Sequence, residues 1–131
     1  MKTKTVLSLF IFSLFMTSAF SQENEKVDPN VLLGEWKLDM SPDDENDTNF
    51  AMMRITNVEN KKIQGTFYRE GVKLKNGQIN TQLGILYAAL TSGDNSGEYN
   101  TSFYFKNGKL YGTTHALNRN FLSVWIAEKV N

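Results

Sequence analysis

Apolar and polar residues alternate with a period of two through most of this chain. The clearest run is Leu32–Met40, where Gly34, Trp36 and Leu38 share one face and charged side chains take the other. Such alternation is typical of a β-strand with one buried and one solvated face. Seven further runs read as strands: Phe50–Val58, Lys62–Glu70, Val72–Asn80, Leu83–Thr91, Glu98–Lys106, Lys109–Leu117 and Phe121–Val130.

Turn-forming residues separate these runs. Asn107-Gly108 lies between two apolar runs and predicts a tight hairpin, because both residues tolerate positive φ. Ser92–Gly97 is expected to be a loop from its composition. Asn76-Gly77 can form another tight turn, which would split the run Val72–Asn80 and leaves the strand register open there.

The connections between the strands decide the fold class. No segment of helical period is long enough to link parallel strands, so neighbouring strands are expected to be antiparallel. About eight sequential strands can form an up-and-down barrel or a small sandwich. We favour the barrel, because a meander of hairpins closes naturally and closure removes exposed edges. The prediction is therefore an all-β domain over residues 31–131.

The N-terminus has the pattern of a secretory signal. Lys2 and Lys4 precede the apolar run Val6–Phe15, and small residues surround the expected cleavage site after Ser21. The apolar run is shorter than the roughly 20 residues of a membrane-spanning helix. We therefore expect residues 1–21 to be a signal peptide and residues 22–30 a flexible polar leader. The mature protein would be periplasmic or extracellular, from a bacterium, without stable membrane insertion.

Charge and cysteine content narrow the function classes. The chain has 14 basic and 14 acidic residues, and loss of Lys2 and Lys4 would leave a slightly acidic domain. Such a domain lacks the clustered basic residues that nucleic acid binding requires. The absence of cysteine excludes thiol catalysis, thiolate metal sites and iron–sulfur clusters.

Two polar features of the chain are candidates for site chemistry. The acidic loop Ser41–Asn49 superficially resembles a calcium loop. Counted from Asp43, however, positions six and twelve are Thr48 and Arg54 instead of glycine and glutamate. We interpret this segment as a solvated loop and predict no metal site. His115 is the only histidine, no carboxylate is near it in sequence, and it can face either side of its strand. No catalytic residue or cofactor is predicted, and the protein is not expected to be an enzyme.

Large aromatic side chains are the main candidates for ligand contact. Two interpretations stay open: they fill the core of a small barrel, or they line a cavity for a small molecule. The strand patterns place most of them on the interior, and Phe121 is expected there too. The cavity candidates are Trp36, Phe67, Tyr87, Phe103, Phe105 and Trp125.

Gly34-Glu35-Trp36 resembles the Gly-x-Trp motif that opens the first strand of lipocalins and of the wider calycin group. The resemblance implies an eight-stranded barrel whose motif tryptophan packs at the closed end against a basic side chain near the last strand. Arg119 and Lys129 are available for this role, and we expect the closure pair to be Trp36 and Arg119.

The avidin branch of the same group is similar in length. Gly112-Thr113-Thr114, ahead of the strand with Trp125, resembles the penultimate avidin strand. The polar residue that avidins place two positions after the first tryptophan is Leu38 here, so no biotin site is assigned.

Two alternative functions remain open, and we favour the first. The first is an exported, lipocalin-like protein that binds a small apolar or amphipathic molecule inside the barrel. The second is an extracytoplasmic structural or interaction protein with a filled core that acts through its surface. An enzyme that uses His115 ranks last.

Overall fold

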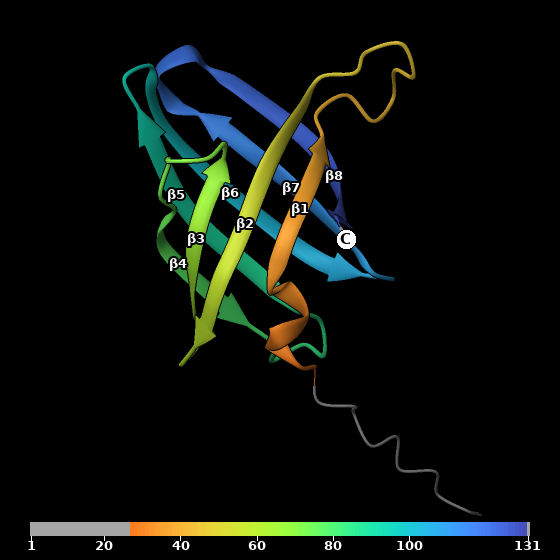
Figure 1. The fold of residues 1–131 in the computed structure, drawn as a ribbon, viewed down its shortest axis with the longest axis vertical. Coiled ribbons are helices and arrows are strands. Elements are labelled where there is room, and N and C mark those ends of the chain that lie inside the picture. Colours follow the sequence, from red (N-terminus) through yellow and green to blue (C-terminus); the bar gives the residue numbers. More distant parts are fainter. Residues whose placement is uncertain (1–26, 131) are drawn as a thin grey trace, which may run out of the picture.

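The computed structural model describes residues 27–130, which form a closed, eight-stranded antiparallel barrel (Figure 1). Each strand pairs with its neighbour in sequence, and β1 pairs with β8 to close the barrel. The strands are β1 (Gly34–Asp39), β2 (Phe50–Glu59), β3 (Lys62–Tyr68), β4 (Lys75–Asn80), β5 (Tyr87–Asp94), β6 (Gly97–Lys106), β7 (Lys109–Ala116) and β8 (Phe121–Val130). The predicted all-β, up-and-down barrel is confirmed.

The predicted signal peptide and most of the leader lie outside the described residues. The last leader residues are ordered, because the 3-10 helix η1 (Pro29–Leu32) begins before the predicted domain boundary. Its first turn is capped by Asp28, whose side chain accepts a hydrogen bond from the Asn30 amide. No helix among residues 27–130 has the length and apolar character needed to cross a membrane.

The structure agrees with the predicted turn at Asn107-Gly108 and differs from the expectation at Ser92–Gly97 and Asn76-Gly77. Asn107 and Gly108 have φ of 52° and 78° and form the expected hairpin turn between β6 and β7. The predicted loop Ser92–Gly97 is wrong in extent, because β5 continues to Asp94 and β6 starts at Gly97. Asn76 has positive φ but marks a register shift within β4 instead of a hairpin turn.

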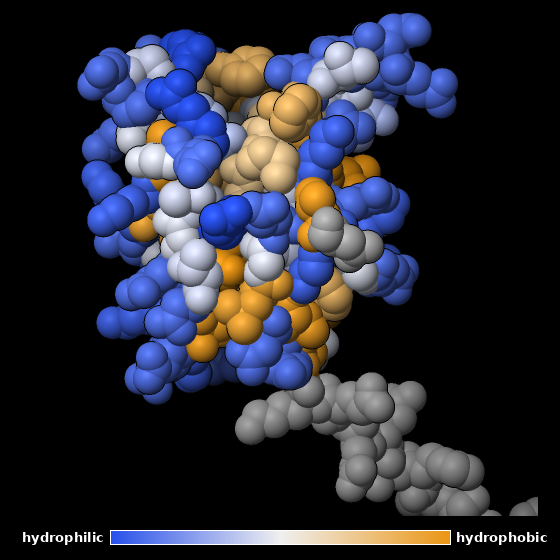
Figure 2. All heavy atoms as spheres, viewed as in Figure 1, coloured by the Kyte–Doolittle hydropathy of each residue, from blue (hydrophilic) through white to orange (hydrophobic). Residues whose placement is uncertain are grey.

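The interior is a continuous apolar core. In β1, Trp36 and Leu38 are buried while Lys37 and Asp39 are exposed, as the alternation predicted. Side chains from all eight strands and η1 join this cluster. At the η1 end of the molecule, hydrophobic side chains also gather on the surface (Figure 2). The other end carries the β1–β2 connection and the β7–β8 turn (Figure 1).

Gly112 in β7 allows the largest interior side chain to fit. A Cβ atom at this position would lie 2.4 Å from Cζ2 of Trp125, its partner in β8. Non-bonded carbon atoms do not approach so closely, so a side chain at position 112 would clash with the ring. Because Gly112 has no side chain, the indole ring packs directly on the β7 backbone. Trp125 is consequently buried completely.

Candidate ligand site at the barrel mouth

The structure places five of the six cavity candidates inside the barrel. Trp125 lies 6.4 Å from Phe67 and 5.9 Å from Phe103 between ring centroids. Trp36 and Phe105 make a second pair at 6.5 Å. These rings pack on one another and on aliphatic side chains, so they act as core. Tyr87 is a correction, because it is 41% exposed and points outward from β5.

The predicted closure pair is also corrected. Lys129, not Arg119, covers Trp36, with its ammonium group 5.1 Å from the ring centroid. Lys129 also donates a hydrogen bond to the carbonyl of Val31 at 2.8 Å, which ties β8 to η1. Arg119 follows β7 and lies at the opposite end, against Tyr99. Sequence distance from Trp36 could not distinguish these two basic residues.

A pocket of about 230 Å³ opens at the end opposite η1, which we call the mouth. Phe67 and Thr114 contribute interior side chains to it, and Phe121 and Arg119 lie at its rim. Phe121 was expected in the interior, but it is 59% exposed. The complete lining is Met40, Asn49, Phe50, Ala51, Phe67, Tyr68, Tyr99, Thr114, Ala116, Arg119, Phe121 and Ser123.

A chain of hydrogen bonds surrounds one side of the mouth. Arg119 donates to the Tyr99 hydroxyl at 2.6 Å, and this hydroxyl lies 2.9 Å from Ser96 Oγ. Ser96 in turn donates to Asp94 at 2.6 Å. The network links the β5–β6 turn to the segment between β7 and β8.

Asp94 is the anionic centre of this network. Hydrogen bonds from the Ser96 and Tyr68 side chains and from the Ser96 amide lower the pKa of Asp94 to about 2. Burial, together with the hydrogen bond to Asp94 and its charge, raises the pKa of Tyr68 to about 12. Arg69 lies 3.3 Å from the same carboxylate. Near neutral pH, therefore, Asp94 is charged and Tyr68 is a neutral donor.

Buried hydroxyl groups form a belt beneath the mouth. Thr101, Thr114 and Ser123 are in register across β6, β7 and β8, and all three are buried. Thr114 Oγ1 lies 3.0 Å from Thr101 Oγ1 and accepts a hydrogen bond from the Trp125 indole at 3.0 Å. Ser92, on β5, is buried at the same end, and its hydroxyl has no hydrogen-bond partner among residues 27–130.

Of the charged side chains at the rim, Asp94 has an ion-pair partner and Arg119 has none among the described residues. Asp94 faces Arg69, whereas Arg119 forms no ion pair with any residue of the described part of the chain. The acidic loop lies at this end, but only Asn49 of it reaches the pocket. Its Asp44 and Asp47 carboxylates accept hydrogen bonds from backbone amides within the loop. The nearest unpaired charge to the pocket is therefore the Arg119 guanidinium.

The other candidates are not brought into this site. His115 lies exposed on the outer face of β7, in register with Asn100 and Leu122. Within residues 27–130, no three histidine, aspartate or glutamate side chains are grouped closely enough to hold a metal ion. The acidic loop is thus a set of local turns in the described structure.

Most residues of the mouth were not among the candidates predicted from the sequence. The position of Tyr99 could have been inferred, because it shares the inward face of β6 with Thr101 and Phe103. Asp94 is the last residue of β5 and Arg69 follows β3, so the alternation of side chains within a strand could not place either of them. Only barrel closure brings these two residues together.

These observations define a class: a small closed β-barrel with a packed interior and an amphipathic pocket at one end. Comparison of the chain with protein-family models, curated proteins and solved structures found no match.

Proposed function

We propose that this chain is an exported, lipocalin-like binding protein that takes a small amphipathic molecule at the barrel mouth. The proposal keeps the expected in-barrel ligand but moves it from the centre to the open end. The observation that supports this proposal most is Arg119, whose guanidinium lies at the rim of an aromatic pocket and has no carboxylate partner among the described residues. Such a group favours a ligand whose polar end is a carboxylate or another anion.

The lining suits an amphipathic ligand. Met40, Phe67 and Phe121 offer apolar contact, whereas Ser123 and Arg119 offer hydrogen bonds. Pockets of this composition, apolar with a few placed polar groups, are typical of small-molecule sites. The volume of about 230 Å³ is below the range of about 300–1,000 Å³ for drug-sized ligands, so the site suits a compact molecule or one end of a longer one.

Lipocalin-like architecture supports the proposal at the level of fold. The Gly-x-Trp tryptophan, Trp36, sits beside η1 at the closed end, with Lys129 over its ring. This arrangement leaves the opposite end open, where lipocalin-like barrels would admit a ligand. Fold likeness alone does not assign a ligand, so the head-group preference rests on Arg119.

The test uses three compounds that differ only in head group: 3-phenylpropionate, 3-phenylpropanol and 3-phenylpropylamine. Binding is measured by calorimetry, and ¹⁵N-NMR shifts locate the site. We expect the carboxylate to bind roughly fivefold to tenfold more tightly than the alcohol, because hydrogen bonds to charged groups are about 1 kcal/mol stronger. The ammonium compound should bind weakest, at low salt most of all.

Arg119→Met is the matched variant, because it keeps side-chain length and removes the charge. It should abolish the carboxylate preference and leave alcohol binding nearly unchanged. The proposal would be wrong if none of the three compounds binds. It would also be wrong if the NMR shifts they cause are confined to a surface other than the mouth.

A separate observation supports the alternative function. The filled core and the exposed, outward Tyr87 agree with the alternative of a protein that acts through its surface. The surface concerned is the outer face of β5–β8.

A further inference from the structure

The outer face of β5–β8 carries a three-by-four array of side chains without a single formal charge. Strand register arranges them in rows across the sheet. One row is Tyr87, Tyr104, Tyr111 and Ile126; the next is Ala89, Ser102, Thr113 and Val124; the third is Thr91, Asn100, His115 and Leu122. The outer face of β1–β3, in contrast, bears charged side chains such as Lys37, Arg54 and Lys62.

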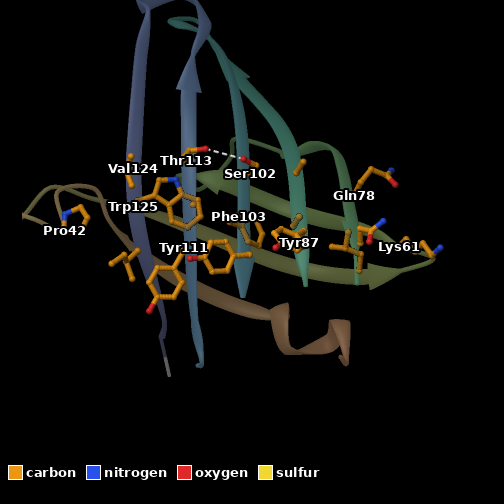
Figure 3. Close-up of a pocket in the computed structure, with 17 residues that line it drawn as sticks. Pro42, Lys61, Gln78, Tyr87, Ser102, Phe103, Tyr111, Thr113, Val124 and Trp125 are labelled. Atoms are coloured by element: carbon orange, nitrogen blue, oxygen red, sulfur yellow. Dashed lines mark hydrogen bonds between the residues drawn. The ribbon is translucent and has the colours of Figure 1, made fainter. Parts of the chain in front are cut away.

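The middle row consists of short side chains, and the rows on both sides of it are longer. A groove of about 910 Å³ crosses the strands along the middle row and the row that starts at Tyr87, and the third row borders a second hollow beside it. Ser102 and Thr113 lie on its floor with their hydroxyls 3.3 Å apart, and Tyr87 and Tyr111 form a neighbouring row (Figure 3). A second hollow, bordered by Asn100 and His115, shares this floor.

The tyrosine row is itself ordered. The rings of Tyr104 and Tyr111 are stacked with centroids 5.4 Å apart and an angle of 16° between planes. Tyr87 extends the row, 6.2 Å from Tyr104. Tyr87 is 41% and Tyr104 37% exposed, so this wall is preformed and accessible. Preformed aromatic contact area costs little conformational entropy on binding.

The groove crosses several neighbouring strands. It extends from Gln78 on β4 to Val124 on β8, and four strand spacings of about 4.8 Å correspond to roughly 19 Å. Lys61 lies at one end and Pro42 at the other (Figure 3). Among the residues that line this groove, Lys61 alone carries a formal charge.

We propose that this groove binds a neutral oligosaccharide chain. An uncharged wall suits an uncharged ligand, because a charged one would lose hydration without gaining a counter-charge. Sugar rings have apolar C–H faces that contact tyrosine rings and hydroxyls that pair with amides and hydroxyls. The groove supplies both kinds of contact: tyrosines line one side, and Gln78, Ser102 and Thr113 offer polar groups along it. Asn100 adds an amide in the adjoining hollow.

Two other occupants fit the groove less well. A second copy of the chain, related by a twofold axis, would place hollow against hollow and leave space unfilled, whereas stable interfaces are packed like protein interiors. A peptide that adds a strand needs an open sheet edge, and this barrel closes through β1 and β8. A linear ligand that is held by side chains alone avoids both problems.

The experiment measures retention of the full protein in native gels that contain neutral polysaccharides, followed by calorimetry with mono- to hexasaccharides of the retaining polymer. Cellulose-, xylan-, mannan- and starch-derived chains are the neutral set, and polygalacturonate is the anionic comparison. We expect retention by at least one neutral polymer, none by polygalacturonate, and affinity that rises with chain length until the groove is filled.

Tyr104→Ala and Val124→Glu should each weaken this binding at least tenfold. Thr56→Glu, an exposed change on the outer face of β2, is the matched control and should have no effect. Arg119→Met should also leave it unchanged, which separates this site from the mouth. Circular dichroism checks that each variant is folded, and all the substituted side chains are solvent-accessible.

Two outcomes would overturn the proposal. One is the absence of retention by every neutral polymer in the set at millimolar sugar concentrations. The other is a dimer in sedimentation velocity that Val124→Glu dissociates, because this result would identify the face as an interface between copies.

Discussion

The two ends of the barrel differ in how they bury aromatic side chains and pair polar ones. At the closed end Trp36 is 1% exposed, its indole donates to the Leu32 carbonyl at 2.8 Å, and Lys129 covers the ring. At the mouth, hydroxyls and charged groups pair with one another while Phe121 stays exposed. Burial of one large aromatic side chain stabilises the first end. At the mouth less aromatic surface is buried, and polar side chains line the pocket instead.

The largest expected effect lies at the closed end. Trp36→Ala should destabilise the protein by about 3–5 kcal/mol, because it removes a fully buried ring and leaves a cavity. Phe121→Ala at the mouth should change stability by no more than about 0.5 kcal/mol, since its side chain is mostly solvated. Urea denaturation at pH 7 compares the two, and equal losses would contradict the division between the ends.

Beneath the mouth, one hydroxyl supports the core. Thr114→Val keeps the shape of the side chain but removes the acceptor of the Trp125 indole. A buried donor without a partner costs about 1–3 kcal/mol, and this is the expected loss. Thr114→Ser retains the hydroxyl and should cost clearly less. If valine proves as stable as threonine, the belt of hydroxyls contributes nothing to folding.

Acid should affect the mouth through Asp94. The pKa of this carboxyl is about 2 in the folded protein, below its ordinary value of 3.8, so it favours folding whenever it is ionised. Its contribution is complete above pH 3.8 and disappears as the pH falls towards 2. Asp94→Asn should therefore lower the urea midpoint most at neutral pH, and the gap to the wild type should narrow as the pH approaches 2.

Asp43→Asn is the control for this pH series, because it removes an equal charge from the exposed acidic loop. Its midpoint should follow the wild type at every pH. A gap between wild type and Asp94→Asn that is independent of pH would contradict a role for the ionised carboxylate.

The smallest expected effects compare the two basic residues. Lys129→Met should cost about 0.5–1 kcal/mol, because it removes the contact of the cation with the Trp36 ring. Arg119→Met should leave stability within about 0.5 kcal/mol and act on ligand binding instead. Thermal unfolding measures both, and a larger loss for Arg119→Met would make this residue structural.

The amino-acid sequence by itself indicated most of the strands and their antiparallel order, and it favoured a closed barrel over a sandwich. These follow from local chemistry: alternation in β1, the Asn107-Gly108 turn, and connections too short for crossover. The same alternation correctly placed Phe67, Phe103 and Trp125 inside the barrel.

Only the tertiary structure decided which residues meet. Barrel closure brought Lys129 rather than Arg119 to Trp36, and it joined Arg119 to Tyr99 at the other end. Register, which sequence could not specify, turned Tyr87 outward into a row with Tyr104. Strand patterns depend on neighbours along the chain, whereas these contacts depend on how eight strands twist and close, which no single segment encodes.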